Sequence, residues 1–249
     1  MNKLLIPVCL AFTLQNAAAE EILPAYNTYS AVPFVVSESG LATELVDYLN
    51  SKLKGKYQFK LRQMTRDALN KEVINDPAFK GVVMFLSPYF VNDAAQSKFW
   101  WSQAIWADGN TLISHNNRKL EYNGPETLYN LKFGGITGNR YAGLEEHFGK
   151  EITREDMTEE LNNLKKLGAG RIDATIMPRS TYRYLLVQMG KEMAAKMQFH
   201  TSSKPHAEFT RHFFIAKNNQ ALAKELDSVV NAMKTDPQWK ALAAKYHLD

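Results

Sequence analysis

A turn with the chemistry of an anion site occupies residues 137–141, which read Thr-Gly-Asn-Arg-Tyr. The sequence predicts a strand over 131–136 before this turn and a helix over 141–148 after it. Free backbone N–H groups and the positive end of the helix dipole favour a negative charge at such a position. Arg140 would add a bidentate clamp for a carboxylate or a phosphate. The alternative is an ordinary helix cap whose arginine faces solvent.

A second arginine, Arg179, lies at the end of another predicted strand, over 172–177. It is either a further anion contact or a surface residue that starts the next helix. Aromatic side chains are dense in the neighbouring segments, and small-molecule clefts are commonly built from aromatic walls with a few polar groups. Stacking on a flat or cationic ligand would follow, although core packing is the alternative for each ring. The aromatic candidates are Tyr29, Phe34, Tyr89, Phe90, Trp100, Trp101, Trp106, Tyr141 and Tyr182.

Catalytic and metal-binding patterns are absent from the sequence. The six histidines form no His-Glu-x-x-His motif or other paired spacing. There is no Gly-x-Ser-x-Gly turn and no glycine pattern for binding a nucleotide. Asp173 lies within a predicted buried strand, where it is either a general base or, in the interpretation we favour, a structural residue. We therefore predict no catalytic residue, no metal and no cofactor.

The N-terminus has the pattern of a cleaved export signal over residues 1–19. Lys3 precedes an apolar run that is too short to span a bilayer, and Ala17 and Ala19 form a small-x-small ending. The alternative is a buried N-terminal strand or helix. Cleavage would remove the only cysteine, Cys9, so that the mature chain would have no disulfide and no thiol nucleophile.

Charge and hydropathy exclude two classes of partner. Lys3 is the only charged residue of the predicted signal, so cleavage lowers the formal net charge from +4 to +3. Charges of both signs are interspersed along the sequence, so there is no basic cluster of the kind that binds nucleic acid. No later segment is apolar enough to cross a membrane. We expect an exported protein that is not embedded in a membrane and is a monomer.

The elements that must position these residues alternate between short apolar runs and helical patterns. Such alternation predicts an α/β fold with largely parallel sheets. A turn-like Asp108-Gly109-Asn110 interrupts one of the expected strands. The predicted strands are 21–26, 57–64, 79–86, 104–114, 131–136, 172–177 and 209–216, and the predicted helices are 41–53, 66–74, 141–148, 158–167, 180–189, 222–233 and 239–246.

Several segments of the chain, in the order in which they occur, resemble the sequences of one known protein family. They are Pro33-Phe34 followed by Gly40-Leu41, ELVDYLN at 44–50, Trp101-Ser102, FGGITGNRYAGLEEHF at 133–148, GRIDATIM at 170–177 and the ending PQWKALAAKYHLD. The chain is similar to the bacterial extracellular solute-binding proteins of family 3. That family includes the periplasmic polar amino-acid-binding proteins of ABC importers.

The resemblance implies the two-lobed type II periplasmic-binding-protein fold, in which each lobe is a mostly parallel sheet flanked by helices. Lobe 1 would contain residues 20–112 and 206–249, and lobe 2 residues 113–205. The strands that cross between them would lie near 111–115 and 204–208. Closure of the lobes about this hinge would trap a small ligand in the cleft. An ABC permease is the implied partner, a membrane sensor is the first alternative, and dehydratase-type chemistry in the same cleft is the second.

The two residues with which the family binds an α-amino acid are missing. The position of the arginine that holds the carboxylate falls on Asn92 or Ala95, and that of the aspartate that holds the ammonium falls on Pro178. We therefore expect a small polar ligand, either anionic or amino-acid-like, with Tyr29 and Trp106 as the preferred aromatic contacts. The full set of candidate ligand contacts is Tyr29, Ser87, Tyr89, Trp106, Thr137, Asn139, Arg140, Tyr141 and Arg179.

Overall fold

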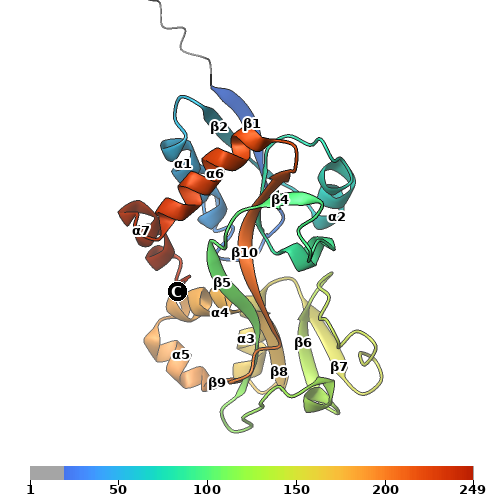
Figure 1. Cartoon of the computed structure of the whole chain (residues 1–249). Coiled ribbons are helices and arrows are strands. Elements are labelled where there is room, and N and C mark those ends of the chain that lie inside the picture. Colours follow the sequence, from blue (N-terminus) through green and yellow to red (C-terminus); the bar gives the residue numbers. More distant parts are fainter. Residues whose placement is uncertain (1–19, 249) are drawn as a thin grey trace, which may run out of the picture.

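Two α/β lobes share one curled sheet of ten strands (Figure 1). The computed structural model describes residues 20–248, and the predicted export signal lies outside the described residues. The strand order is β2-β1-β3-β10-β5-β8-β6-β7, with β4 paired to β10 and β9 paired to β5. The predicted two-lobed α/β fold is confirmed. Within the described part of the chain, no helix combines the length and the apolar composition that a membrane span requires.

Lobe 1 is built on three parallel strands that continue into an antiparallel one. The parallel strands are β2, β1 and β3, and β3 then pairs with β10. Its elements are β1 (Glu21–Asn27), α1 (Leu41–Lys52), β2 (Tyr57–Gln63), α2 (Arg66–Leu69) with a π turn (Asn70–Ile74), β3 (Val82–Leu86), a 3-10 turn (Pro88–Val91), β4 (Phe99–Trp101), α6 (Gln220–Met233) and α7 (Pro237–Lys245).

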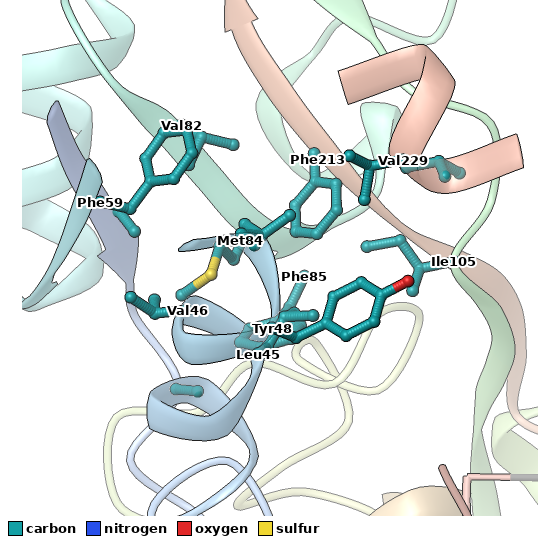
Figure 2. Close-up of a cluster of buried hydrophobic side chains, with 14 of the residues drawn as sticks. Leu45, Val46, Tyr48, Phe59, Val82, Met84, Phe85, Ile105, Phe213 and Val229 are labelled. Atoms are coloured by element: carbon teal, nitrogen blue, oxygen red, sulfur yellow. The ribbon is translucent and has the colours of Figure 1, made fainter. Parts of the chain in front are cut away.

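The main core of lobe 1 lies between this sheet and α1, α6 and α7. In α1 the apolar residues recur at helical spacing, which places Leu45 and Tyr48 on the buried face. Figure 2 shows these side chains near Met84 and Phe85 of β3 and Phe213 of β10. Every residue of β3 is buried, as expected for a central strand covered on both faces.

Lobe 2 repeats the arrangement, with β7, β6 and β8 parallel and β5 antiparallel to β8. Its elements are a 3-10 turn (Pro125–Leu128), β6 (Lys132–Ile136), β7 (Thr153–Met157), α3 (Glu160–Gly168), β8 (Ala174–Pro178), α4 (Arg179–Met189), α5 (Lys191–Met197) and β9 (Phe199–Thr201). Each lobe therefore has a parallel half and an antiparallel half, so the sheet is more mixed than predicted.

Two long antiparallel strands, β5 (Trp106–His115) and β10 (Ala207–Ala216), pass between the lobes (Figure 1). They pair with each other from Trp106–Arg211 to Asn110–Ala207. Further along, β5 pairs with β8 of lobe 2, whereas β10 pairs with β3 and β4 of lobe 1. The predicted turn at residues 108–110 is wrong, because β5 is continuous there. Gly109 instead permits a close approach, since a Cβ at this position would lie 2.7 Å from the carbonyl oxygen of Ala207.

The predicted helix over 141–148 is also wrong: these residues form successive turns. Gly143 has a φ of 76°, outside the right-handed helical region. The carboxylate of Glu145 accepts a hydrogen bond from the backbone N–H of Tyr141 (2.6 Å), which draws the chain into a local loop. Four short elements, β4, β7, β9 and α5, were not predicted. Their residues lack a clear apolar period, and pairing with neighbouring strands stabilises the three strands.

Candidate functional site

A cavity of about 680 Å³ lies between the two lobes. Lobe 1 contributes the loop that follows β1, the start of α2 and the end of β3. Lobe 2 contributes the ends of β6, β7 and β8 and the first turns of α3 and α4. In α/β proteins ligands bind at the carboxyl ends of parallel strands, where the loops and helix N-termini gather. The lining residues are Thr28, Tyr29, Ser30, Ala31, Val32, Phe34, Val35, Ser37, Arg66, Leu86, Ile136, Asn139, Thr158, Glu159, Glu160, Leu161, Pro178, Thr181 and Leu185.

An aromatic wall forms the lobe 1 side of this cavity. The rings of Tyr29 and Phe34 are stacked with their centroids 4.6 Å apart. The guanidinium of Arg211 packs over both rings, 4.5 Å from the Tyr29 centroid and 4.8 Å from that of Phe34. A cation packed against these faces restrains both rings. These contacts hold the two rings against each other and against Arg211.

The lobes touch each other beside the cavity. Thr181 of α4 donates a hydrogen bond from Oγ1 to the backbone carbonyl oxygen of Val32 in lobe 1 (2.7 Å). The side chain of Val32 packs against a buried apolar cluster of lobe 2 that includes Ile113 and Leu164. The loop after β1 thus connects lobe 1 to lobe 2 at the edge of the cavity.

The charged side chains of the cavity wall are of opposite sign on the two lobes. Lobe 1 contributes Arg66, whose Nε donates to Asn70 Oδ1 (3.2 Å) and whose Nη2 donates to the carbonyl oxygen of Phe90. Lobe 2 contributes Glu159 and Glu160 at the start of α3. Arg66 and Glu160 were not predicted as site residues.

Solved structures with the same architecture cover nearly the whole chain. An ancestral arginine-binding protein bound to glutamine is 13% identical with a TM-score of 0.64, covering 93% of this chain and 100% of that one. The GluR0 ligand-binding core from Nostoc punctiforme in complex with L-glutamate is 16% identical with a TM-score of 0.64, covering 92% and 100%. The substrate-binding protein of an amino acid ABC transporter is 14% identical with a TM-score of 0.60, covering 90% and 98%.

The chain has the type II periplasmic-binding-protein fold. No protein-family model matches the sequence, and no curated protein matches it. The likeness to the binding-protein fold therefore rests on three-dimensional structure, at identities that establish the fold alone.

Of the nine predicted contacts, Tyr29 and Asn139 line the cavity of this binding-protein fold. Ser87 is buried at the start of a 3-10 turn, and the side chain of Tyr89 is 72% exposed. Trp106 lies behind the aromatic wall, with its ring centroid 6.5 Å from that of Phe34. Ser87, Tyr89 and Trp106 are not among the lining residues.

The turn over residues 137–141, predicted as an anion site, differs from the prediction in its position relative to the cavity and in the element that follows it. Thr137 and Arg140 are exposed and do not line the cavity. The turn lacks a helix at its end, so the dipole argument for an anion does not apply. Instead, Arg154 of β7 holds the turn by donating from Nη2 to the carbonyl oxygens of Ile136 (3.1 Å) and Asn139 (2.9 Å).

Tyr141 and Arg179 have structural partners away from the cavity. Tyr141 is 4% exposed, and its hydroxyl accepts a hydrogen bond from the backbone N–H of Ile136 (2.9 Å). Burial raises the pKa of Tyr141 to about 12. Arg179 forms a bidentate ion pair with Glu208 of β10 (2.6 and 2.7 Å), which neutralises its charge.

Asp173, the residue weighed as a general base in the sequence, does not line the cavity. Among residues 20–248, no three His, Cys, Asp or Glu side chains come together as a set that could hold a metal ion. Asp173 lies at the surface of lobe 2, in an ion pair with Arg118 (2.9 Å). The arrangement can enclose a small molecule, stack an aromatic wall against it and present charges of both signs.

Proposed function

We propose that this protein is an exported solute-binding protein that captures a small polar molecule between its lobes for delivery to an ABC importer. The observation that carries the proposal is the cavity itself, which both lobes build and whose polar groups come from both. Closure of the lobes would bury a ligand on all sides, as a hinge-type binding protein requires. Similar structures that hold glutamine and L-glutamate support an amino-acid-sized ligand.

The proposal includes the export signal over residues 1–19 and a periplasmic location. It also includes lobe boundaries at 20–112 with 206–249 and at 113–205. The proposed contacts retain Tyr29 and Asn139 from the sequence prediction and add Arg66, Glu160 and Thr181 from the cavity wall. We propose binding without turnover, which the likeness to proteins described as binding proteins supports.

A second candidate function keeps the binding but replaces import with sensing. The likeness to the ligand-binding core of GluR0 favours this candidate. Deletion of the gene separates the two: loss of uptake of the ligand favours import, and loss of a transcriptional response with normal uptake favours sensing.

Mass spectrometry of the protein purified from its native periplasm tests the binding function. We expect one small molecule at close to one equivalent, released by denaturation. Ser30 is exposed on the cavity wall, so Ser30→Trp should fill the cavity and abolish the co-purified molecule. Ser228→Trp, on the exposed face of α6, is the matched control and should retain it. No bound molecule, or the same amount with Ser30→Trp, would contradict the proposal.

A further inference from the structure

Three helices of lobe 2 lie together on one side of its sheet and form one outer surface of the molecule (Figure 1). Leu164 of α3 and Leu185 of α4 belong to one buried cluster with Ile113 of β5 and Met177 of β8. The short helix α5 contacts both α3 and α4. The outward sides of these helices and the loop after α3, all within residues 160–197, therefore make up one face, which we call the helical face.

The helical face has an excess of positive charge. Residues 160–197 contain seven Lys and Arg and three Asp and Glu, whereas lobe 1, taken as residues 20–112 and 206–249, contains 15 of each kind. Two of the seven cations form ion pairs, Lys166 with Glu155 and Arg179 with Glu208. The other five are exposed, and no Asp or Glu of residues 20–248 forms an ion pair with them: Lys165, Arg171, Arg183, Lys191 and Lys196.

The acidic residues of this segment do not neutralise the five free cations. Glu160 is buried in the cavity wall and Asp173 is held in its own ion pair, which leaves Glu192 of α5 as the exposed carboxylate of residues 160–197. The helix dipole favours Lys165 in the last turn of α3, but it disfavours Lys191 in the first turn of α5. Neither pairing nor the dipole therefore accounts for the whole excess, and its field attracts an anionic partner.

A groove in the helical face has a lining suited to phosphate. It has a volume of about 590 Å³ and lies at the C-terminal end of α3. Lys165, Lys166 and Arg171 line it together with Asn162. Ammonium and guanidinium groups are the cations with which proteins contact phosphate, and those of Lys165 and Arg171 are free to do so.

Two exposed apolar side chains lie among the cations. Val187 is 54% exposed and Met193 is 46% exposed, and they flank Gly190, which separates α4 from α5. No residue of α5 is buried. Met197 packs onto Gly168 of α3, where there is no room for a Cβ, and the opposite side of α5 has no partner among residues 20–248. Apolar side chains flanked by Lys and Arg are typical of helices that lie in a membrane interface.

We propose that the helical face binds the surface of a membrane that contains anionic phospholipids. The five free cations contact the phosphate groups, and Val187 and Met193 enter the headgroup region. A lipid surface fits this face better than an acidic protein does. The five cationic side chains form no hydrogen bond with residues 20–248 that would fix their positions, and a fluid lipid layer adjusts to them. None of these seven side chains lines the cavity between the lobes, so the inference goes beyond the proposed function and is independent of the ligand.

Sedimentation with lipid vesicles tests the inference. The protein used lacks residues 1–19, so that the apolar run of the predicted signal cannot itself insert into lipid. One set of vesicles is pure phosphatidylcholine, and the other is an equal mixture of phosphatidylcholine and phosphatidylglycerol. At low salt we expect binding to the anionic vesicles to be on the order of tenfold tighter, or more, than binding to the neutral ones. This ratio should fall as the salt is raised to about 0.15 M, because the Debye length shortens to about 8 Å.

Two variants with the same loss of charge locate the contact. The test variant removes three free cations of the helical face by combining Arg183→Gln, Lys191→Gln and Lys196→Gln. It should weaken binding to anionic vesicles by at least about tenfold. The control variant removes three exposed cations of lobe 1 by combining Lys54→Gln, Lys60→Gln and Lys80→Gln. It should leave binding within about twofold, because charges beyond a Debye length from the lipid are largely screened. Circular dichroism confirms that each variant is folded.

Met193→Gln tests the apolar contact and should weaken binding by about threefold at both salt concentrations, because burial of apolar surface is not screened. Three results would overturn the inference: equal binding to neutral and anionic vesicles, no binding to either, or the same loss in the control variant as in the test variant. An absence of binding to vesicles would leave an acidic protein as the partner for this face. None of these results bears on the proposed function, which the co-purified molecule tests separately.

Discussion

Arg211 and Asp108 form a fully buried ion pair between the two strands that join the lobes. Nη2 of Arg211 lies 2.7 Å from Oδ2 of Asp108, and the side chains are 0% and 1% exposed. Arg211 also donates from Nη1 to the carbonyl oxygen of Phe85 in lobe 1 (3.2 Å). Asp108 accepts a hydrogen bond from the hydroxyl of Ser180 in lobe 2 (2.8 Å). One polar network therefore links both lobes through β5 and β10, directly behind the aromatic wall of the cavity.

Breaking this pair should be strongly destabilising. Arg211→Met leaves the buried carboxylate of Asp108 without its cation, and we expect a loss of roughly 3–5 kcal/mol in the free energy of unfolding. Arg62→Met is the matched control, because the ion pair of Arg62 with Glu72 is exposed and worth less than about 1 kcal/mol. Urea denaturation measures both. Equal losses of unfolding free energy in the two variants would contradict a larger contribution of the buried ion pair to stability.

The hydrogen bond between Thr181 and Val32 should stabilise the closed form. Thr181→Val removes the hydroxyl at constant shape, and the bond exists only while the lobes are in contact. A net hydrogen-bond contribution of about 1 kcal/mol corresponds to a ligand affinity weaker by about fivefold. Thr235→Val removes a hydroxyl that bonds within lobe 1, to Ala232, and should leave the affinity unchanged. Calorimetry with the co-purified ligand decides, and identical affinities would contradict the role of the bond.

Glu121 should make the stability of lobe 2 depend on pH. Hydrogen bonds from the Ser203 hydroxyl and backbone N–H, together with those from His200 and Ser202, lower its pKa from 4.5 to about 2. A depressed pKa stabilises the folded state above the unfolded value, and this contribution is lost as the pH falls through the folded value. The stability difference between the native chain and Glu121→Gln should be fully present above about pH 5 and shrink towards pH 2.

Thermal unfolding between pH 2 and 7 measures this difference. Ser203→Ala removes the side-chain hydrogen bond that is the largest cause of the lowered pKa of Glu121. The stability difference between the native chain and Ser203→Ala should therefore show part of the same pH dependence. A difference between Glu121→Gln and the native chain that stays constant over the whole range would contradict the assignment.

Tyr141 provides a test of its placement in the core of lobe 2. Tyr141→Phe removes the acceptor of the Ile136 backbone N–H, and we expect a cost of about 1 kcal/mol in unfolding free energy. Ligand affinity should stay within about twofold, because the ring does not line the cavity. An affinity loss of tenfold without a change in stability would restore the original expectation that Tyr141 contacts the ligand.

The fold could be predicted from the sequence because its main signals are periodic. The apolar spacing in α1 predicted a helix over 41–53, and the helix spans Leu41–Lys52. Short elements lack such a period: β7 reads Thr-Arg-Glu-Asp-Met and owes its place to pairing with β6. The helix predicted over 141–148 failed because Gly143 and the side chain of Glu145 favour local turns.

The candidate site could be predicted only in part. Tyr29 and Asn139 follow β1 and β6, so their positions at strand ends were visible in the sequence. Arg66 and Glu160 fell inside predicted helices and had the pattern of ordinary charged residues in a first helical turn. What distinguishes Glu160 is burial without a partner, which depends on how lobe 2 packs against the cavity. No local pattern reports that property.

Small-angle X-ray scattering tests the central claim that the cavity between the lobes captures a small molecule. The radius of gyration is measured for protein stripped of ligand and again after addition of the molecule identified by mass spectrometry. The account predicts a smaller radius in the presence of the ligand, with no such change in Ser30→Trp. An unchanged radius at saturating ligand would contradict capture by closure of the two lobes.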